Sequence, residues 1–344
     1  MSEPITIVGG GLAGLTLGIG LLQRGVPVAV WEAGHYPRHR VCGEFISGRG
    51  QDALARLGLL KAIENAGTRL ARSAAFFAGK VSVPPRPLPQ PALCISRFVL
   101  DKLLADEFQS LGGELKAGER WRGSDGAGIV RASGRRVEPV VDGYRWIGLK
   151  VHARNVLPSA DMELHFVPSG YVGLCRLPGD TVNICGMFRS KSTFPELSKN
   201  WRQWLIGPEG SALHVRLAGA QFDEDTFCTV AGLDTRPQKA TTLTGCCIGD
   251  ALTMIPPMTG NGMSMAFESA ELAIEPLVDF SRGHLAWPQA QRQIAVACDH
   301  RFSGRLRWAG WLQRFLFLPR ARTALILLTA RSEGVSRALF NLTR

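Results

Sequence analysis

Three glycines near the N-terminus have the spacing of a phosphate-binding turn. Gly9, Gly11 and Gly14 form a G-x-G-x-x-G pattern, directly after the apolar run 5–8 and directly before a helical pattern. Such a turn needs residues without side chains, because the backbone bends sharply and approaches a pyrophosphate closely. The helix that follows would direct free N–H groups and the positive end of its dipole at the phosphates. The spacing therefore predicts a dinucleotide site.

An acidic residue follows at the position that such a site requires. Glu32 comes directly after the second apolar run, 26–31, and is followed by Ala33. A carboxylate here accepts hydrogen bonds from an adenosine ribose and disfavours a 2′-phosphate. We therefore expect FAD or NAD at this site, and not NADP.

A second glycine-rich segment, late in the chain, favours FAD. Asp250 follows Gly249 after an apolar run, where a carboxylate can bind the ribityl chain of a flavin. Pro257 gives a rigid surface without a donor, suited to a planar ring. The glycines around Asn261 begin a helix whose N-terminus would stabilise the negative charge of a reduced flavin. The cofactor-binding residues expected from both segments are Gly9, Gly11, Leu12, Ala13, Gly14, Glu32, Ala33, Gly249, Asp250, Pro257, Gly260, Asn261, Gly262 and Met263.

Two further stretches complete a resemblance to a known family. Residues 37–44 read Pro-Arg-His-Arg-Val-Cys-Gly-Glu, and residues 96–101 begin with Ser-Arg and end with Leu-Asp. Together with the glycine segments, they resemble the FAD-dependent family of the aromatic hydroxylases and geranylgeranyl reductases, over most of residues 1–280. The first stretch is similar to a loop beside the flavin in the reductase branch, and the second to a helix start whose arginine reaches the FAD phosphates. The resemblance adds four cofactor-binding residues: Arg40, Cys42, Gly43 and Arg97.

Two motifs depart from that family's pattern. Residues 132–135 read Ala-Ser-Gly-Arg, where the family usually has an acid that the hydroxylases associate with nicotinamide use. The aromatic strand motif of the reductases appears only in degenerate form over 171–176. Three functions therefore stay open. The expected one is a reductase that transfers hydride from reduced flavin to a C=C bond of a lipophilic molecule. The alternatives are an NAD(P)H-dependent monooxygenase that hydroxylates or epoxidises a hydrophobic or aromatic substrate, and a non-catalytic lipid-escort protein.

Four side chains are candidates for the catalytic site. Glu44 is the preferred proton donor, because burial near a flavin would raise the pKa of its carboxyl group, and Cys42 lies beside it. Strand alternation places His152 with Lys150 on one face, and Tyr171 on another. His152 could serve as a general acid and Tyr171 could orient the substrate. A purely structural role stays open for Cys42, Tyr171 and His152.

The pattern of elements predicts how these residues are held. Residues 5–31 read as strand, helix and strand, and a buried strand over 243–249 precedes a helix over 262–277. Between them, alternation over 144–188 predicts consecutive antiparallel strands, and the prolines within 84–91 predict an extended connector. We predict an α/β fold with a Rossmann-like FAD-binding domain of the glutathione-reductase type, interrupted by an antiparallel β-sheet substrate domain. The predicted ranges are 1–70, 94–140 and 240–300 for the FAD-binding domain, 71–93 and 141–239 for the substrate domain, and 301–344 for a helical basic C-terminal segment.

Composition limits the class of protein. The chain of 344 residues is 45% hydrophobic and 20% charged, which suits a large folded core. Its first residues lack the basic region of a signal peptide, and no apolar run reaches the ~20 residues of a membrane-spanning helix. Eight cysteines without paired spacing predict reduced thiols, and no Cys/His cluster has zinc spacing. We therefore expect a cytoplasmic protein without a metal, with NAD(P)H or a carrier protein as transient electron donor.

Most of the positive charge lies at the C-terminus. The net charge is +11, and residues 301–344 contain nine arginines and one acid, Glu333. Trp308, Trp311 and Phe315 are interleaved with these arginines. Such a segment suits peripheral contact with an anionic membrane, a lid over a tunnel for a hydrophobic small-molecule substrate, or simple packing on the protein. Nucleic acid is not an expected partner, because the basic residues belong to no binding motif.

Overall fold

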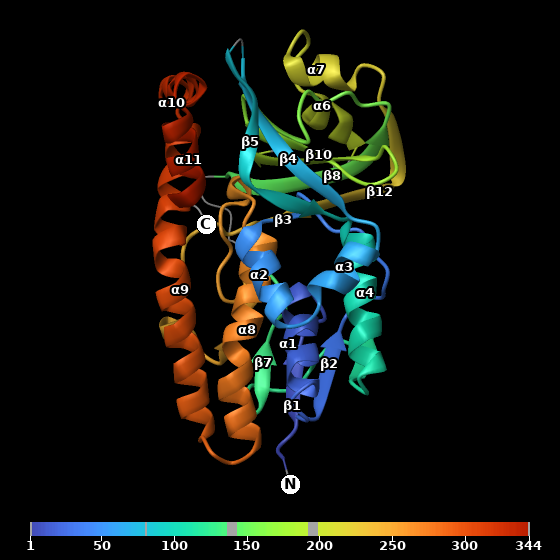
Figure 1. Cartoon of the computed structure of the whole chain (residues 1–344), viewed down its shortest axis with the longest axis vertical. Helices are drawn as coiled ribbons and strands as arrows, with labels where there is room; N and C mark the ends of the chain where they lie inside the picture. Colours follow the sequence, from blue (N-terminus) through green and yellow to red (C-terminus); the bar gives the residue numbers. More distant parts are fainter. Residues whose placement is uncertain (1, 80, 136–142, 192–198, 343–344) are drawn as a thin grey trace.

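The chain forms two β-sheets that are joined along one side by a long helix. The computed structural model describes residues 2–79, 81–135, 143–191 and 199–342. In Figure 1 the lower half contains the smaller sheet and most helices, and the upper half contains the larger sheet. The long helix α9 (Trp287–Leu316) runs along the left side of both halves (Figure 1).

The smaller sheet is parallel and has five strands. In spatial order they are β13 (Cys246–Cys247), β7 (Ile129–Arg131), β1 (Ile5–Val8), β2 (Val28–Glu32) and β6 (Glu114–Ala117). Helix α1 (Leu12–Leu22) connects β1 to β2 and is buried on nearly all sides, which explains its lack of a polar face. The predicted Rossmann-like unit is confirmed. The strand expected over 243–249 is reduced to two residues, because short 3₁₀ turns flank it at Ala240–Thr242 and Gly249–Ala251.

Helices enclose this sheet and complete the core of the lower half. Helix α4 begins after Ser96, whose Oγ accepts a hydrogen bond from the backbone N–H of Val99 at 3.3 Å. Helix α8 packs against α1 and, on its other side, against α9. The helices around the sheet are α2 (Gly48–Arg56), α3 (Leu60–Asn65), α4 (Arg97–Ser110) and α8 (Gly262–Ser281).

The larger sheet has eight strands. In spatial order they are β12 (Gln221–Ala231), β8 (Arg145–Arg154), β11 (Val182–Ser190), β10 (Gly170–Arg176), β9 (Met162–Val167), β4 (Arg69–Ala78), β5 (Val81–Cys94) and β3 (Phe45–Ile46). Neighbouring strands are antiparallel except β4 and β9, which pair in parallel. The consecutive antiparallel strands predicted over 144–188 are β8 to β11. The predicted domain boundaries stay a prediction.

The proline-rich segment is a strand and not the predicted connector. It belongs to β5, which pairs with β4 at residues 81–83, 86–87 and 92–94 and with the short β3 at Leu93 and Cys94. Over 81–91 one side of β5 is therefore an edge, where a missing N–H removes no ladder hydrogen bond. Two irregularities in the register with β4 accommodate the prolines.

The two faces of the larger sheet have different covers. Helices α6 (Trp201–Ile206) and α7 (Ala212–Leu217) pack on the outer face, against an apolar cluster that includes Leu149 and Val151 of β8. The inner face is turned towards the half that contains the smaller sheet and towards the C-terminal helices α9 and α10 (Pro319–Arg331), which precede α11 (Glu333–Leu342). A buried bidentate ion pair at 2.7 and 2.8 Å joins Arg305 of α9 to Glu268 of α8.

A buried carboxylate in the larger sheet should make stability depend on pH. Glu163 accepts hydrogen bonds from His165 at 2.7 Å and from the Ser159 hydroxyl at 2.6 Å. Burial alone would raise its pKa, but these partners lower it from 4.5 to about 2. A carboxyl group whose pKa is lower in the folded state than in the unfolded state stabilises the fold. This stabilisation is complete at pH values above the unfolded-state pKa and is lost as the pH falls through the folded-state pKa. The shift of Glu163 corresponds to about 3 kcal/mol.

We therefore expect Glu163→Gln to be less stable than the wild type at neutral pH, with a difference that shrinks as pH falls towards about 2. Urea unfolding at several pH values measures this difference. The exposed Glu119→Gln serves as the control. A wild-type advantage that stays constant over the acid range would contradict the assignment.

Candidate functional site

The two glycine-rich segments, far apart in the sequence, meet in the structure. A Cβ at Gly249 would lie 2.8 Å from the Cβ of Ala13, so the 3₁₀ turn Gly249–Ala251 contacts the first turn of α1 directly. A Cβ at Gly14 would overlap the carbonyl oxygen of Gly9, so the helix and the turn can cross this closely only because residue 14 is a glycine. Gly9 itself has φ +115°, a conformation that favours glycine. Both segments therefore belong to one site.

Open space lies in front of this crossing. A Cβ at Gly11 would have no neighbour within 4 Å among the described residues, and Gly262 at the start of α8 is equally open. The first turns of α1 and α8 have no side-chain cap. Their free N–H groups and helix dipoles thus point at two places where negative charge would be stabilised.

Glu32 organises the turn on the other side. Its carboxylate accepts hydrogen bonds from the N–H groups of Gly10 at 2.9 Å and Gly34 at 2.8 Å, and from Arg38 at 2.9 Å. Burial would raise its pKa, but the hydrogen bonds from Arg38 and Gly34 lower it. Glu32 is therefore ionised, at the predicted place beside the glycine turn. The neighbouring Ala33 is exposed.

Arginine side chains converge on the same space. Arg97 is held by Asp101 in a bidentate pair at 2.7 and 2.9 Å, and Arg38 is held by Glu32. Arg40 has its buried Nε without a partner among the described residues, and its pKa is lowered by burial and by the charges of Arg38 and Arg97. An unneutralised cation beside an uncapped helix N-terminus fits a pyrophosphate.

Asp250 lies at the other end of this arginine group. Burial raises the pKa of its carboxyl group, while Arg97, Arg135 and Arg40 oppose that shift. A carboxylate in this position fits a sugar-alcohol chain, whose hydroxyl groups would replace the lost water. The open glycines, the partnerless Nε of Arg40 among the described residues, and Asp250 together fit FAD.

The start of α8 meets β3 and Ser47, the residue that follows it. The Ser47 hydroxyl donates to Oδ1 of Asn261 at 3.0 Å, and a Cβ at Gly260 would clash with the ring of Phe45. Met263 is buried in the core, as is Leu12 at the start of α1. At these two positions only the backbone can reach the cofactor. Gly43 and Pro257 lie in the two loops that meet here.

A buried cluster of acidic and basic side chains lies beyond this loop. Glu44 is fully buried, and its Oε2 lies 2.6 Å from Nε2 of His152. Its Oε1 lies 3.3 Å from Nζ of Lys150, which is also fully buried, and accepts the backbone N–H of Arg97 at 2.8 Å. Lys150 in turn lies 3.1 Å from Nδ1 of His39. We call Glu44, Lys150, His152 and His39 the acid–base cluster.

The predicted pKa of Glu44 is wrong in direction. Burial would raise it, as expected, but the hydrogen bond from His152, the charges of Lys150 and His152, and the N–H of Arg97 lower it. The carboxyl group is therefore ionised at neutral pH and does not itself donate a proton. Glu44 also has φ +61°, a conformation that a residue with a side chain adopts only when its surroundings hold it there.

The acid–base cluster resembles a metal site in its ligand types, but it already contains a cation. The ligand atoms of His39, Glu44 and His152 lie within 4.8 Å of one another. Lys150, however, places its ammonium group against both Glu44 and His39. Burial, Lys150 and His152 lower the pKa of His39 to about 4, so its neutral ring accepts from Lys150. The ammonium group of Lys150 therefore supplies the positive charge that a divalent cation would supply in a metal site of this kind.

Cys42 has a structural role in the loop. Its sulfur accepts the N–H of Glu44 at 3.4 Å, and its carbonyl oxygen accepts from Asn183 of β11 at 2.9 Å. Burial raises the pKa of the Cys42 thiol, so the reactive thiolate is disfavoured. The loop is thereby attached to the inner face of the larger sheet.

Strand pairing places His152 and Tyr171 on the same face, and not on different faces as predicted. Tyr171 pairs with Met187, which pairs with Gly148, two residues before Lys150 on β8. Paired residues in antiparallel strands point to the same side. The inner face is therefore polar at His152 and apolar near Tyr171, where burial raises the pKa of the phenol well above its usual value.

The apolar part of this face continues into a cluster shared with other elements. Tyr171 and Met187 pack with Met254 and with Leu316 of α9. Met258, in the loop before α8, is partly buried against the same cluster. A lipophilic molecule on this face would thus lie between the cofactor loop and the C-terminal helices.

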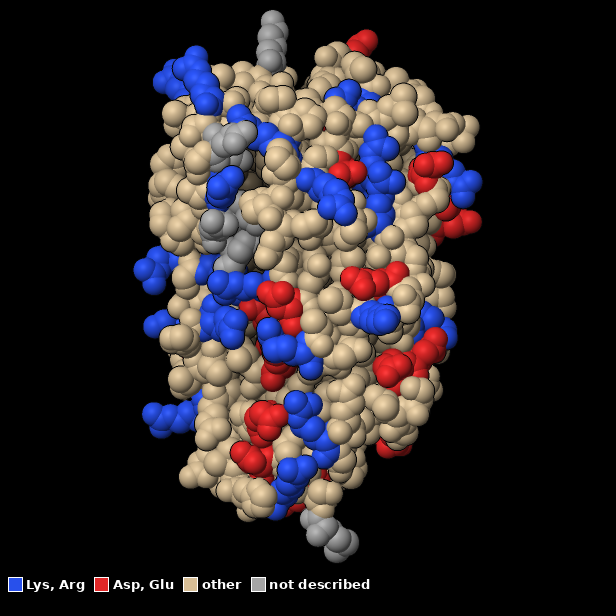
Figure 2. All heavy atoms as spheres, in the orientation of Figure 1, with Lys and Arg blue, Asp and Glu red and all other residues tan. Residues whose placement is uncertain are grey.

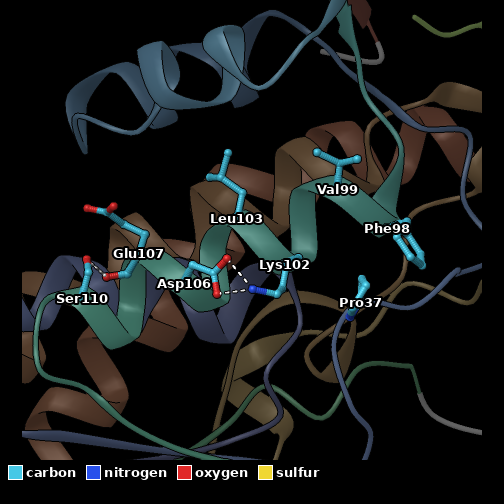
Figure 3. Close-up of a pocket in the computed structure, with 8 residues that line it drawn as sticks. All are labelled: Pro37, Phe98, Val99, Lys102, Leu103, Asp106, Glu107 and Ser110. Carbon is cyan, nitrogen blue, oxygen red and sulfur yellow. Dashed lines mark hydrogen bonds and ion pairs between the residues drawn. The ribbon is translucent and has the colours of Figure 1, made fainter. Parts of the chain in front are cut away.

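A surface groove of about 550 Å³ runs along the outer face of α4 (Figure 3). Pro37 and Phe98 lie at one end of it and Ser110 at the other (Figure 3). The ring of Phe98 stacks on His39 at 4.7 Å, and His39 meets His152 edge-on at 5.2 Å. Only this end of the groove approaches the acid–base cluster, and the aromatic rings separate the two.

Three residues of the site are not predicted from the sequence as members of it. Strand alternation predicts that Lys150 lies on the face of His152 but indicates no role for it, although a lysine on an inward-facing strand position is itself a signal. His39 lies in the loop that the resemblance assigns to cofactor binding. Asp101 follows Arg97 by one helical turn, a spacing that favours an ion pair.

The comparisons with known proteins agree with the cofactor that the site fits. Residues 3–139 match the family model described as a FAD binding domain, which supports FAD as the cofactor. Over its length the chain has the fold of flavin-dependent halogenases and of PqsL. No helix in the part of the chain that the structure describes combines the length and apolarity needed to span a bilayer.

Individual relatives are distant. Conditioned medium factor receptor 1 of Dictyostelium discoideum is 22% identical, over 94% of this chain and 73% of its own length. The flavin-dependent brominase Bmp2 is 18% identical with a TM-score of 0.73, over 100% of this chain and 95% of the brominase. PqsL of P. aeruginosa, in complex with 2-aminobenzoylacetate, is 15% identical with a TM-score of 0.71, over 93% and 98% of the two chains. These structures share the fold.

Proposed function

We propose that the chain is a FAD-dependent monooxygenase whose substrate is a lipophilic molecule with an ionisable hydroxyl group, such as an alkylated phenol. The ionised, buried carboxylate of Glu44, hydrogen-bonded to His152, carries this proposal. A carboxylate that is kept charged beside an imidazole is arranged to help take up a proton. Proton removal from a phenol increases the electron density on its ring, which favours attack on an electrophilic oxygen.

Each residue has a distinct task in this scheme. FAD, once bound and reduced, supplies the activation of dioxygen that oxygen insertion requires. In its neutral form, His152, held at Nε2 by Glu44, takes the hydroxyl proton of the substrate at Nδ1, and Glu44, which Lys150 keeps ionised, stabilises the resulting positive charge. Tyr171 and the apolar cluster around it orient the alkyl part of the substrate.

A reductase is the second candidate. The Cys-Gly-Glu sequence at 42–44 is similar to that of the reductase branch. In a reductase, bound and reduced FAD would supply hydride to one carbon of the C=C bond, and protonated His152 beside Glu44 would supply the proton to the other carbon. Lipid escort is the weakest of the three, because the glycines, Arg40 and Asp250 fit a bound cofactor. NAD(P)H or a carrier protein stays the predicted electron donor, and the hydrophobic substrate stays a prediction.

One experiment separates these functions. The FAD-loaded protein is reduced with dithionite without air, a panel of alkylphenols and prenylated compounds is added, and oxygen is then admitted. We expect the mass spectrum to show products with one additional oxygen atom, formed only after oxygen enters. A product with two additional hydrogens before oxygen enters would overturn the monooxygenase in favour of the reductase. The same panel with free FAD controls for chemistry without the protein.

A further inference from the structure

The outer face of α9 carries an exposed row of aromatic side chains near its C-terminal end. Trp308, Trp311 and Phe315 are 41%, 48% and 37% exposed. The Trp308 and Trp311 ring centroids are 5.7 Å apart, and those of Trp311 and Phe315 are 4.1 Å apart. Leu318, between α9 and α10, is 58% exposed. We call these four residues the aromatic ridge. The spacing of three and four positions places Trp308, Trp311 and Phe315 on one side of α9, and Leu318 follows the end of that helix.

Positive charge accompanies the aromatic ridge. Arg307 and Arg314 are exposed and lie one turn before and after Trp311, and Arg320 is exposed at the start of α10. The sequence has no Asp or Glu from residue 301 to 332. Figure 2 shows basic side chains projecting from the left edge, where α9 lies in Figure 1, without acidic neighbours along that edge.

We propose that the aromatic ridge docks on the surface of an anionic lipid bilayer. Tryptophan prefers the headgroup region, where its ring is half in apolar surroundings, and arginines are attracted to anionic headgroups. A helix with apolar and basic side chains on its exposed face lies in the plane of that interface. Because none of the described helices can span a bilayer, the contact is peripheral. The arginines favour an anionic surface, and the exposed tryptophans favour the headgroup region of a bilayer as that surface.

The inner side of the same helical segment faces the site. Leu316 and Ile326 are buried in the apolar cluster that contains Tyr171, and Phe317 meets Trp146 edge-on at 5.0 Å. Only this helical layer separates the aromatic ridge from that cluster. A substrate dissolved in the bilayer would therefore reach the site without crossing bulk water. This delivery step rests on the proposed function, whereas the docking step does not.

Vesicle flotation of the FAD-loaded full chain tests the docking step. We expect binding to vesicles of phosphatidylcholine with phosphatidylglycerol, a weaker association with phosphatidylcholine alone, and release by salt. Arg307→Gln/Arg314→Gln should bind at least about tenfold more weakly, because each basic residue near an anionic surface contributes about fivefold. Trp308→Ala/Trp311→Ala should bind weakly to both vesicle types.

Matched variants elsewhere on the surface serve as controls. Arg120→Gln/Arg122→Gln makes the same change in charge at exposed positions outside α9, and Leu157→Ala removes a side chain that is 78% exposed. Both should bind as the wild type does. Equal binding by ridge and control variants would overturn the proposal, as would failure of the wild type to bind either vesicle. Retained flavin absorbance confirms that each variant is folded.

A separate assay distinguishes docking from function. Product formation from an alkylphenol presented in anionic vesicles should fall in the ridge variants, while formation from the same compound in detergent should not. Vesicle binding without product in either form would leave docking supported and would contradict the proposed function. Equal turnover of the vesicle-bound compound by wild type and ridge variants would overturn the delivery step.

Discussion

Gly11→Val should give a folded protein that no longer binds FAD, whereas Gly14→Val should not fold stably. Gly11 has φ −85°, which valine can adopt, and no described atom lies within 4 Å of its Cβ position. The added methyl groups would enter only the space assigned to the pyrophosphate. At Gly14 the side chain would overlap the carbonyl oxygen of Gly9, within the protein itself.

Flavin titration and thermal unfolding measure the two effects. A steric conflict of about 3 kcal/mol corresponds to about a hundredfold weaker binding, and we expect at least this loss of FAD affinity for Gly11→Val. Circular dichroism of its FAD-free form should match that of the FAD-free wild type. Gly11→Val with normal FAD affinity would show that the phosphates lie elsewhere.

The second large effect concerns the acid–base cluster. His152→Gln should lower kcat on a hydroxylated substrate by about 10²- to 10⁴-fold, the usual contribution of a general base. Rate measurements with the best alkylphenol of the panel test this expectation.

Glu44 and Lys150 allow a charge-balanced control. Glu44→Gln leaves the buried ammonium group of Lys150 without its anion, a change that typically costs about 3–5 kcal/mol. Glu44→Gln/Lys150→Met removes both charges and should recover much of the stability but not the activity. Full activity of the double variant would refute the role of Glu44, and an unstable double variant would show that its role is structural.

Local chemistry explains which parts of the fold and site the sequence predicts. The turn at Gly9–Gly14 and the acid at Glu32 depend on neighbours within about thirty residues, and both lie where expected. The cofactor is likewise predicted from motifs, because its backbone contacts require glycines at fixed positions.

Long-range pairing explains the parts that the sequence predicts wrongly. The charge state of Glu44 depends on His152 and Lys150, which the pairing of β8 brings to it from more than a hundred residues away. The common face of His152 and Tyr171 depends on the register of β11 with both neighbouring strands. The proline segment becomes a strand because β4 lies beside it, which no local pattern reveals.

The left-handed backbone of Glu44 has a consequence for how the protein takes up its cofactor. Glycine would adopt φ +61° more easily, so the contacts of the carboxylate with His152, Lys150 and Arg97 hold the loop in this shape. The same loop carries Arg40 and Gly43 towards the cofactor. The side chain of Glu44 therefore supports both the loop that binds the cofactor and the proton transfer at His152. A substitution of Glu44 that weakens cofactor binding should also weaken proton transfer.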